Sequence, residues 1–146
     1  MATAIRPERN GQDFELIVCS MLRQRGADFE RQRWFRPSIY GYDWKVDVFV
    51  KNAESFRNGL VIECKWQESD GSADEKLPYL VANIRTLPCP AIIIAGGRDA
   101  RIAGHGARAG ALKWLQAQID EHLIAVLTLE QLLPWLRRQT FSRPVR

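Results

Sequence analysis

The spacing of apolar residues divides the chain into alternating helical and extended segments. Apolar residues at helical spacing between Phe14 and Leu22 predict a helix over 13–25, which Gly26 is placed to end. Alternating or wholly apolar runs predict strands at 28–36, 45–50, 60–67, 91–95 and 123–127. Helical patterns predict further helices over about 72–86, 107–119 and 128–138. The order α-β-β-β-α-β-α-β-α indicates an α/β fold, in which the short apolar run 91–95 suits a central strand covered on both faces.

Local signals fix some of the helix ends and the extent of the domain. Ser72 with Glu75 and Thr128 with Gln131 have the spacing of capping boxes, while Pro134 is expected to kink or shorten the last helix. Residues 1–10 read as a lead-in, 11–140 as a single domain and 141–146 as a tail.

Three charged residues interrupt two strands that otherwise look buried. Asp47 lies in the run 45–50, and Glu63 and Lys65 lie in the run 60–67. Because strand side chains alternate between faces, Glu63 and Lys65 share one face, and Asp47 is expected to share a face with Lys45 and Phe49, opposite Val46, Val48 and Val50. In an antiparallel hairpin, the two carboxylates and the ammonium could converge on one spot. Such oxygen ligands suit magnesium or manganese; the plainer alternative is a cross-strand ion-pair cluster on a solvated face.

Composition narrows the class of protein. The 146 residues carry a net charge of +4, and 16 of the 21 basic residues are Arg, whose planar guanidinium matches phosphate geometry. This balance fits nucleic-acid binding, although many proteins are mildly basic. No apolar run is long enough to span a membrane and residues 1–7 lack a signal-peptide core, so a cytoplasmic protein is expected. Three scattered cysteines indicate neither a zinc site nor a disulfide framework.

Basic residues gather near the charged strands. Arg31, Arg33 and Arg36 alternate with aromatic residues, including Trp34, and are candidates for DNA binding. Lys45 and Lys76 are further candidates, with solvated surface charge as the alternative. The tryptophans are expected to belong to the core.

The arrangement of Asp47 followed by Glu63-Cys64-Lys65 resembles the D…(D/E)xK signature of the PD-(D/E)xK nuclease superfamily. Glu15 is similar to the helix glutamate often found ahead of that signature, and Gln67 to the glutamine that follows it in some branches. Residues 71–79 and 94–115 look like stretches of small type II restriction enzymes. One departure is Val46, which stands where the name-giving proline would be.

The resemblance implies a restriction-endonuclease-like core, a mixed sheet of about five strands flanked by helices. It implies a homodimeric DNA endonuclease in which Asp47, Glu63 and the main-chain carbonyl of Cys64 bind Mg²⁺, for which Mn²⁺ could substitute. Lys65 would act on the attacking water or the phosphate, and Glu15 and Gln67 would support the site; Glu15 could instead be an ordinary first-turn glutamate and Gln67 a loop residue. Two alternatives to a restriction-like endonuclease stay open. One is a nuclease similar to archaeal-type Holliday-junction resolvases, and the other is a DNA-binding module that does not cleave.

Overall fold

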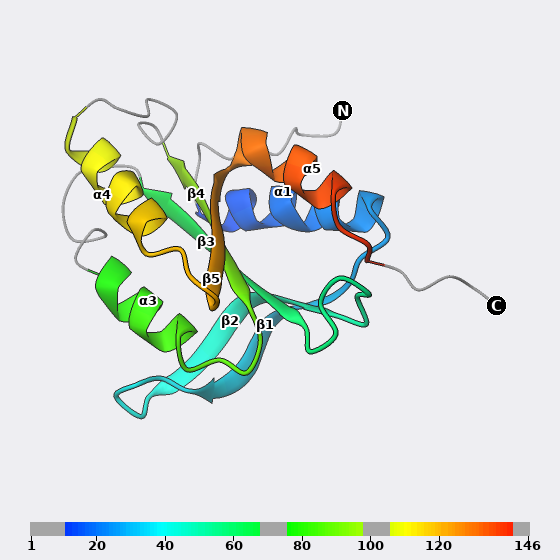
Figure 1. The fold of residues 1–146 in the computed structure, drawn as a ribbon, viewed down its shortest axis with the longest axis horizontal. Coiled ribbons are helices and arrows are strands. Elements are labelled where there is room, and N and C mark those ends of the chain that lie inside the picture. Colours follow the sequence, from blue (N-terminus) through cyan, green and yellow to red (C-terminus); the bar gives the residue numbers. More distant parts are fainter. Residues whose placement is uncertain (1–10, 68–75, 98–105, 142–146) are drawn as a thin grey trace.

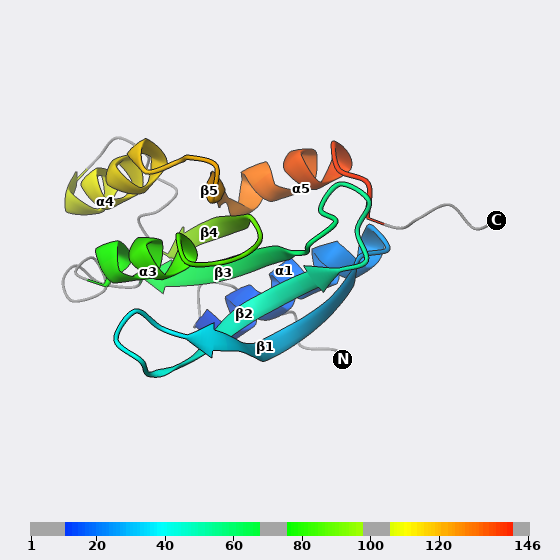
Figure 2. The same ribbon diagram turned by 60° about the horizontal axis from the view of Figure 1, so that its bottom comes forward.

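A computed structural model describes residues 11–67, 76–97 and 106–141, which form one five-stranded sheet with helices on both faces (Figures 1 and 2). The strands lie in sequence order and are β1 (Asp28–Pro37), β2 (Asp43–Lys51), β3 (Leu60–Gln67), β4 (Ala91–Gly97) and β5 (Leu123–Thr128). The helices of the described part are α1 (Gly11–Gln24), α3 (Leu77–Ile84), α4 (Gly106–Ala117) and α5 (Leu129–Arg137). The predicted element order is therefore confirmed. None of the helices described is long and apolar enough to cross a membrane.

The sheet is mixed, as predicted. β1–β2 and β2–β3 pair antiparallel, and β3–β4 and β4–β5 pair parallel. The inner strand β4, between β3 and β5, is covered on both sides: Ile92 and Ile94 pack with α1 and α5, and Ala91 and Ile93 pack with α3 and α4. These four side chains are fully buried, which explains the uninterrupted apolar run in the sequence.

Two of the predicted caps form and one lies outside the described residues. Gly26 follows α1 with a φ of 73°, the left-handed conformation expected of a C-terminal cap. The N–H of Thr128 donates to Gln131 Oε1 at 3.0 Å, the reciprocal half of a capping box. α5 continues through Pro134 to Arg137. The Ser72–Glu75 box falls in 68–75, and the described part of α3 begins at Leu77.

The expected alternation along β2 is wrong at one point. Val46 packs on the α3–α4 side, whereas Val48 packs on the α1–α5 side, so the two valines do not share a face. The reason is a local irregularity. β2 pairs with β3 only through Val48–Val50, and the β1 residue between the partners of Val46 and Val48 is Gln32, whose φ is 50°. Asp47 therefore lies where the regular pleat ends and β2 separates from β3.

Candidate active site

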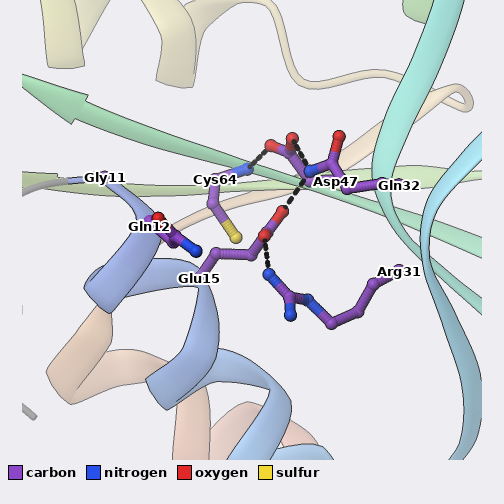
Figure 3. A pocket seen from close by; sticks show the side chains of 7 residues that line it. All are labelled: Gly11, Gln12, Glu15, Arg31, Gln32, Asp47 and Cys64. Carbon is purple, nitrogen blue, oxygen red and sulfur yellow. Dashed lines mark hydrogen bonds and ion pairs between the residues drawn. The ribbon is translucent and has the colours of Figure 1, made fainter.

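A pocket of about 340 Å³ opens on the α1 side of the sheet, where β2 and β3 separate (Figure 3). It is bordered by the start of α1 and by the middle of β1, β2 and β3. The lining residues are Gly11, Gln12, Glu15, Arg31, Gln32, Asp47 and Cys64. The helix and the strands thus bring together Glu15 and Asp47, which are 32 positions apart in the sequence.

Two carboxylates tie β2 to β3 beyond the last paired residues. Asp47 Oδ2 accepts a hydrogen bond from the Cys64 N–H at 2.8 Å, and Glu63 Oε1 accepts one from the Asp47 N–H at 2.9 Å. Each carboxylate therefore satisfies a main-chain donor that a continuous ladder would have paired. Glu63 is 4% exposed and is not among the lining residues, so its carboxylate reaches Asp47 from within the core rather than from the pocket.

Glu15 projects from the first turns of α1 and is held by two side chains of β1. It is 6% exposed; its Oε2 lies 2.5 Å from Arg31 Nη2, and its Oε1 accepts from Gln32 Nε2 at 2.7 Å. The same Gln32 nitrogen lies 3.2 Å from Asp47 Oδ1, so the amide bridges the two carboxylates (Figure 3). Gln32 was missed in the sequence because glutamine carries no signal for the left-handed φ that this position adopts.

Burial and neighbouring charges raise the pKa values of two carboxylates of the site, Glu63 and Asp47. Burial first and then the charge of Asp47 raise the pKa of Glu63 from 4.5 to about 8, while the Asp47 N–H and Lys65 oppose the shift. Burial is also the main reason that the pKa of Asp47 is raised, with Glu15 adding to the shift and the Cys64 N–H and Lys65 opposing it. The charge of Lys65 thus favours the ionised form of both carboxylates, and Lys65 pairs with Ala95 of β4 in the parallel register.

The donor set of this site fits a hard divalent cation. Glu15 and Asp47 border the pocket, and the Glu63 carboxylate accepts the Asp47 N–H beside it. Asp47 and Glu63 have raised pKa values because they are buried beside like charges. Among residues 11–67, 76–97 and 106–141, no three acidic, His or Cys side chains converge as a ready-made metal cluster. In this conformation Arg31 and Gln32 occupy carboxylate oxygens that a cation would use.

The predicted DNA-binding arginines are distributed over different contacts. Arg31 is committed to Glu15, whereas Arg33 lies over the Phe49 ring at 4.6 Å and 3.6 Å from Glu30. Arg36 donates to the Thr86 carbonyl.

The remaining predicted residues lie near the same end of the sheet. Lys45 is exposed and pairs with Trp34, while Lys76 is the N-cap residue of α3. Gln67 is the last residue of β3 and pairs with Gly97. Trp44 is 9% exposed and belongs to the core as expected, but the expectation is wrong for Trp34, which is 52% exposed on the outermost strand.

Comparison with known proteins yields one match. A family model described as a PD-(D/E)XK nuclease superfamily domain matches residues 2–140, nearly the whole chain. No curated protein and no solved structure matches it. The matched span contains every strand and helix of the fold described above, together with all residues of the pocket.

Proposed function

The chain belongs to the PD-(D/E)XK nuclease superfamily, and on that premise we propose that it is a Mg²⁺-dependent DNA endonuclease. Nucleases of this superfamily typically use divalent metals. The observation that carries the proposal is the reciprocal pair formed by Asp47 and Glu63 where β2 and β3 separate. Two buried carboxylates with raised pKa values, with Lys65 beside them, are costly for stability and useful for holding a cation.

We assign metal binding to Asp47, Glu63 and the main-chain carbonyl of Cys64. An ionised carboxylate offers about four lone-pair sites, so the bonds to main-chain N–H groups leave acceptor capacity on both side chains. Asp47 Oδ1 is bound by the Gln32 amide at 3.2 Å, the longest of the bonds in the cluster, and is the oxygen most easily released. A bound Mg²⁺, or Mn²⁺ in its place, would supply a nucleophilic water and stabilise charge on the phosphate.

The neighbouring side chains take supporting roles in this proposal. The charge of Lys65 favours the ionised form of both carboxylates, and in this proposal its ammonium orients the attacking water or neutralises the phosphate. Glu15, fixed by Arg31, borders the pocket and can accept a proton or hold a water. Gln67 ends the strand that carries Glu63 and Lys65, and we assign it a hydrogen bond to a ligand carboxylate or to the phosphate.

Cleavage of both DNA strands requires two such sites, and we propose that a homodimer provides them. Arg33, Arg36, Lys45 and Lys76 would contact the DNA backbone. A restriction-enzyme-like activity and a junction-resolvase-like activity share all these features, and a non-cleaving DNA-binding module would keep the fold without turnover.

Cleavage assays with a matched pair of variants test the proposal. Supercoiled plasmid, linear duplex and a four-way junction are incubated with Mg²⁺, Mn²⁺ or EDTA. The parent should cut at least one substrate with metal and none with EDTA. Lys65→Ala should lower the cleavage rate by roughly 100-fold or more while DNA affinity stays near the parental value. Lys113→Ala removes an exposed lysine of α4 and should leave both unchanged.

The outcomes separate the alternatives. A parent that binds DNA but cuts none of the substrates with either metal would establish the non-cleaving module. Near-parental cleavage by Lys65→Ala would reduce Lys65 to an ion-pair partner.

A further inference from the structure

The loop between β1 and β2 exposes an unusual amount of apolar surface. Residues 38–42 connect the two strands, and within them Ile39 is 45%, Tyr40 70% and Tyr42 71% exposed. Figures 1 and 2 show this loop at the end of the molecule where α3 lies. Large exposed aromatic side chains gathered on one short loop are typical of an interaction surface.

The loop is held in one conformation by its own hydrogen bonds. Ser38 Oγ accepts from the N–H groups of Tyr40 at 3.3 Å and Tyr42 at 3.2 Å, and the Ser38 N–H donates to the Tyr42 carbonyl at 2.8 Å. The chain turns at Gly41, whose φ of 82° suits glycine. The two tyrosines therefore project from a preorganised turn, and little conformational entropy is lost when a ligand binds them.

The loop is also fixed to α3. The Ile39 N–H donates at 2.8 Å to Oδ1 of Asn83, a side chain that is only 2% exposed. The Tyr40 ring stacks on the ring of Tyr79, with centroids 5.0 Å apart and an interplanar angle of 17°. Since Tyr79 covers one face of Tyr40 and the residue is still 70% exposed, the other face of the ring is open to solvent. The two rings form a platform, hereafter the Tyr40–Tyr79 platform.

We propose that the Tyr40–Tyr79 platform stacks an unpaired base of the DNA substrate. This inference rests on the proposed function and narrows it to DNA that contains unpaired bases, such as a fork, a flap or an open junction. An exposed flat aromatic face binds a base of any sequence, whereas the bases of an intact duplex already stack on each other.

Charge and position favour DNA as the occupant. The strand segments beside the loop carry the exposed residues Arg36 and Lys45 against one carboxylate, Asp43. Tyr42 precedes Asp47 by five residues in the direction of β2, about 16 Å along an extended strand. The loop that carries the platform thus adjoins the start of the strand that carries the candidate site, about 16 Å from Asp47 along β2.

Binding assays in EDTA, where no cleavage occurs, test the platform. The probes are a labelled single strand, a forked duplex with unpaired arms and a duplex whose ends are closed by hairpins. Tyr40→Ala should weaken binding of the single strand and the fork by roughly 5- to 100-fold and change binding of the closed duplex less than about 2-fold. Tyr40→Phe keeps the ring and should bind as the parent does. Trp114→Ala removes an exposed aromatic side chain from α4 and serves as the matched control.

Each other outcome overturns the inference. Equal losses on all three probes would mean a general backbone contact, and unchanged binding would mean that the platform does not touch DNA. A parental dimer that becomes a monomer in Tyr40→Ala, measured by sedimentation without DNA, would assign the surface to a second copy of the chain. The two proposals can fail separately. If the parent cuts DNA with Mg²⁺ and Tyr40→Ala binds all three probes as tightly as the parent, only the platform is refuted. Tyr40-dependent binding without any cleavage refutes only the nuclease.

Discussion

Replacing Glu63 by glutamine should stabilise the metal-free protein, and increasingly so as the pH rises. Glutamine has nearly the same shape and keeps an oxygen that can accept the Asp47 N–H, a bond of 2.9 Å in the parent. It carries no charge. The substitution therefore removes the ionisation of a side chain that is 4% exposed and preserves its contact with β2.

The magnitude follows from the pKa of Glu63, which burial and the charge of Asp47 raise from 4.5 to about 8. Because the folded pKa lies above the unfolded one, the contribution of Glu63 to stability is fully present below about pH 4.5 and is lost as the pH rises to about 8. At about 1.4 kcal/mol per pKa unit, the full loss is on the order of 5 kcal/mol, of which about 3 kcal/mol has been lost at pH 7. Glutamine does not ionise, so the Glu63→Gln variant does not lose this stability as the pH rises.

Urea unfolding in EDTA at pH 4.5, 7 and 8.5 measures the effect. The free energies of unfolding of parent and Glu63→Gln should be close at pH 4.5 and should differ by several kcal/mol in favour of the variant at pH 8.5. Glu54→Gln, at an exposed position in the β2–β3 connection, is the control and should follow the parent at every pH. A constant difference between parent and Glu63→Gln over this range would refute the reasoning, because it would mean that Glu63 ionises as easily in the folded protein as in the unfolded chain.

Two further predictions concern a side chain of the pocket and a glycine in the β2–β3 connection. In Gln32→Asn, the asparagine tolerates a left-handed φ but is too short to bridge Glu15 and Asp47. Because the bridge belongs to the metal-free state, calorimetry should show that the variant binds Mn²⁺ several-fold tighter than the parent does. Weaker binding would mean that Gln32 helps to hold the cation. Gly59→Ala places a Cβ 2.4 Å from the buried Phe49 ring at a φ of 98° and should lower the free energy of unfolding by about 1–3 kcal/mol. The same change at Gly41, where φ is also positive but nothing lies within 4 Å, should cost less, and equal losses at both glycines would show that the contact with Phe49 is unimportant.

The fold was largely predictable because its signals are local and periodic. The run 91–95 is apolar at every position since β4 is covered on both faces, and Gly26 and Thr128 mark helix ends through backbone requirements that few residues satisfy. The grouping of Glu15 with Asp47 could be anticipated only through the family resemblance, since no periodicity links a helix to a strand so far along the chain.

What could not be predicted depends on irregular backbone. Alternation along β2 fails between Val46 and Val48 because β2 leaves β3 there, and a pattern of period two contains no information about where a ladder ends. The same irregularity gives Gln32 its place between the carboxylates. Neither Tyr40 nor Tyr42 stands in a periodic pattern, and the stack of Tyr40 on Tyr79 is a tertiary contact with α3 that the sequence does not indicate.

The separation of β2 from β3 has a consequence for how this protein can change over evolutionary time. The N–H groups of Asp47 and Cys64 have acceptors only because the carboxylates of Glu63 and Asp47 stand in for the missing strand partner. A descendant that loses Asp47 loses activity under the proposed function and also leaves a main-chain donor without its acceptor. Such a lineage could keep its fold only by closing the gap between the strands or by recruiting another acceptor. Selection for a folded chain alone would therefore slow the erosion of these two carboxylates, even in a host that no longer needs the reaction.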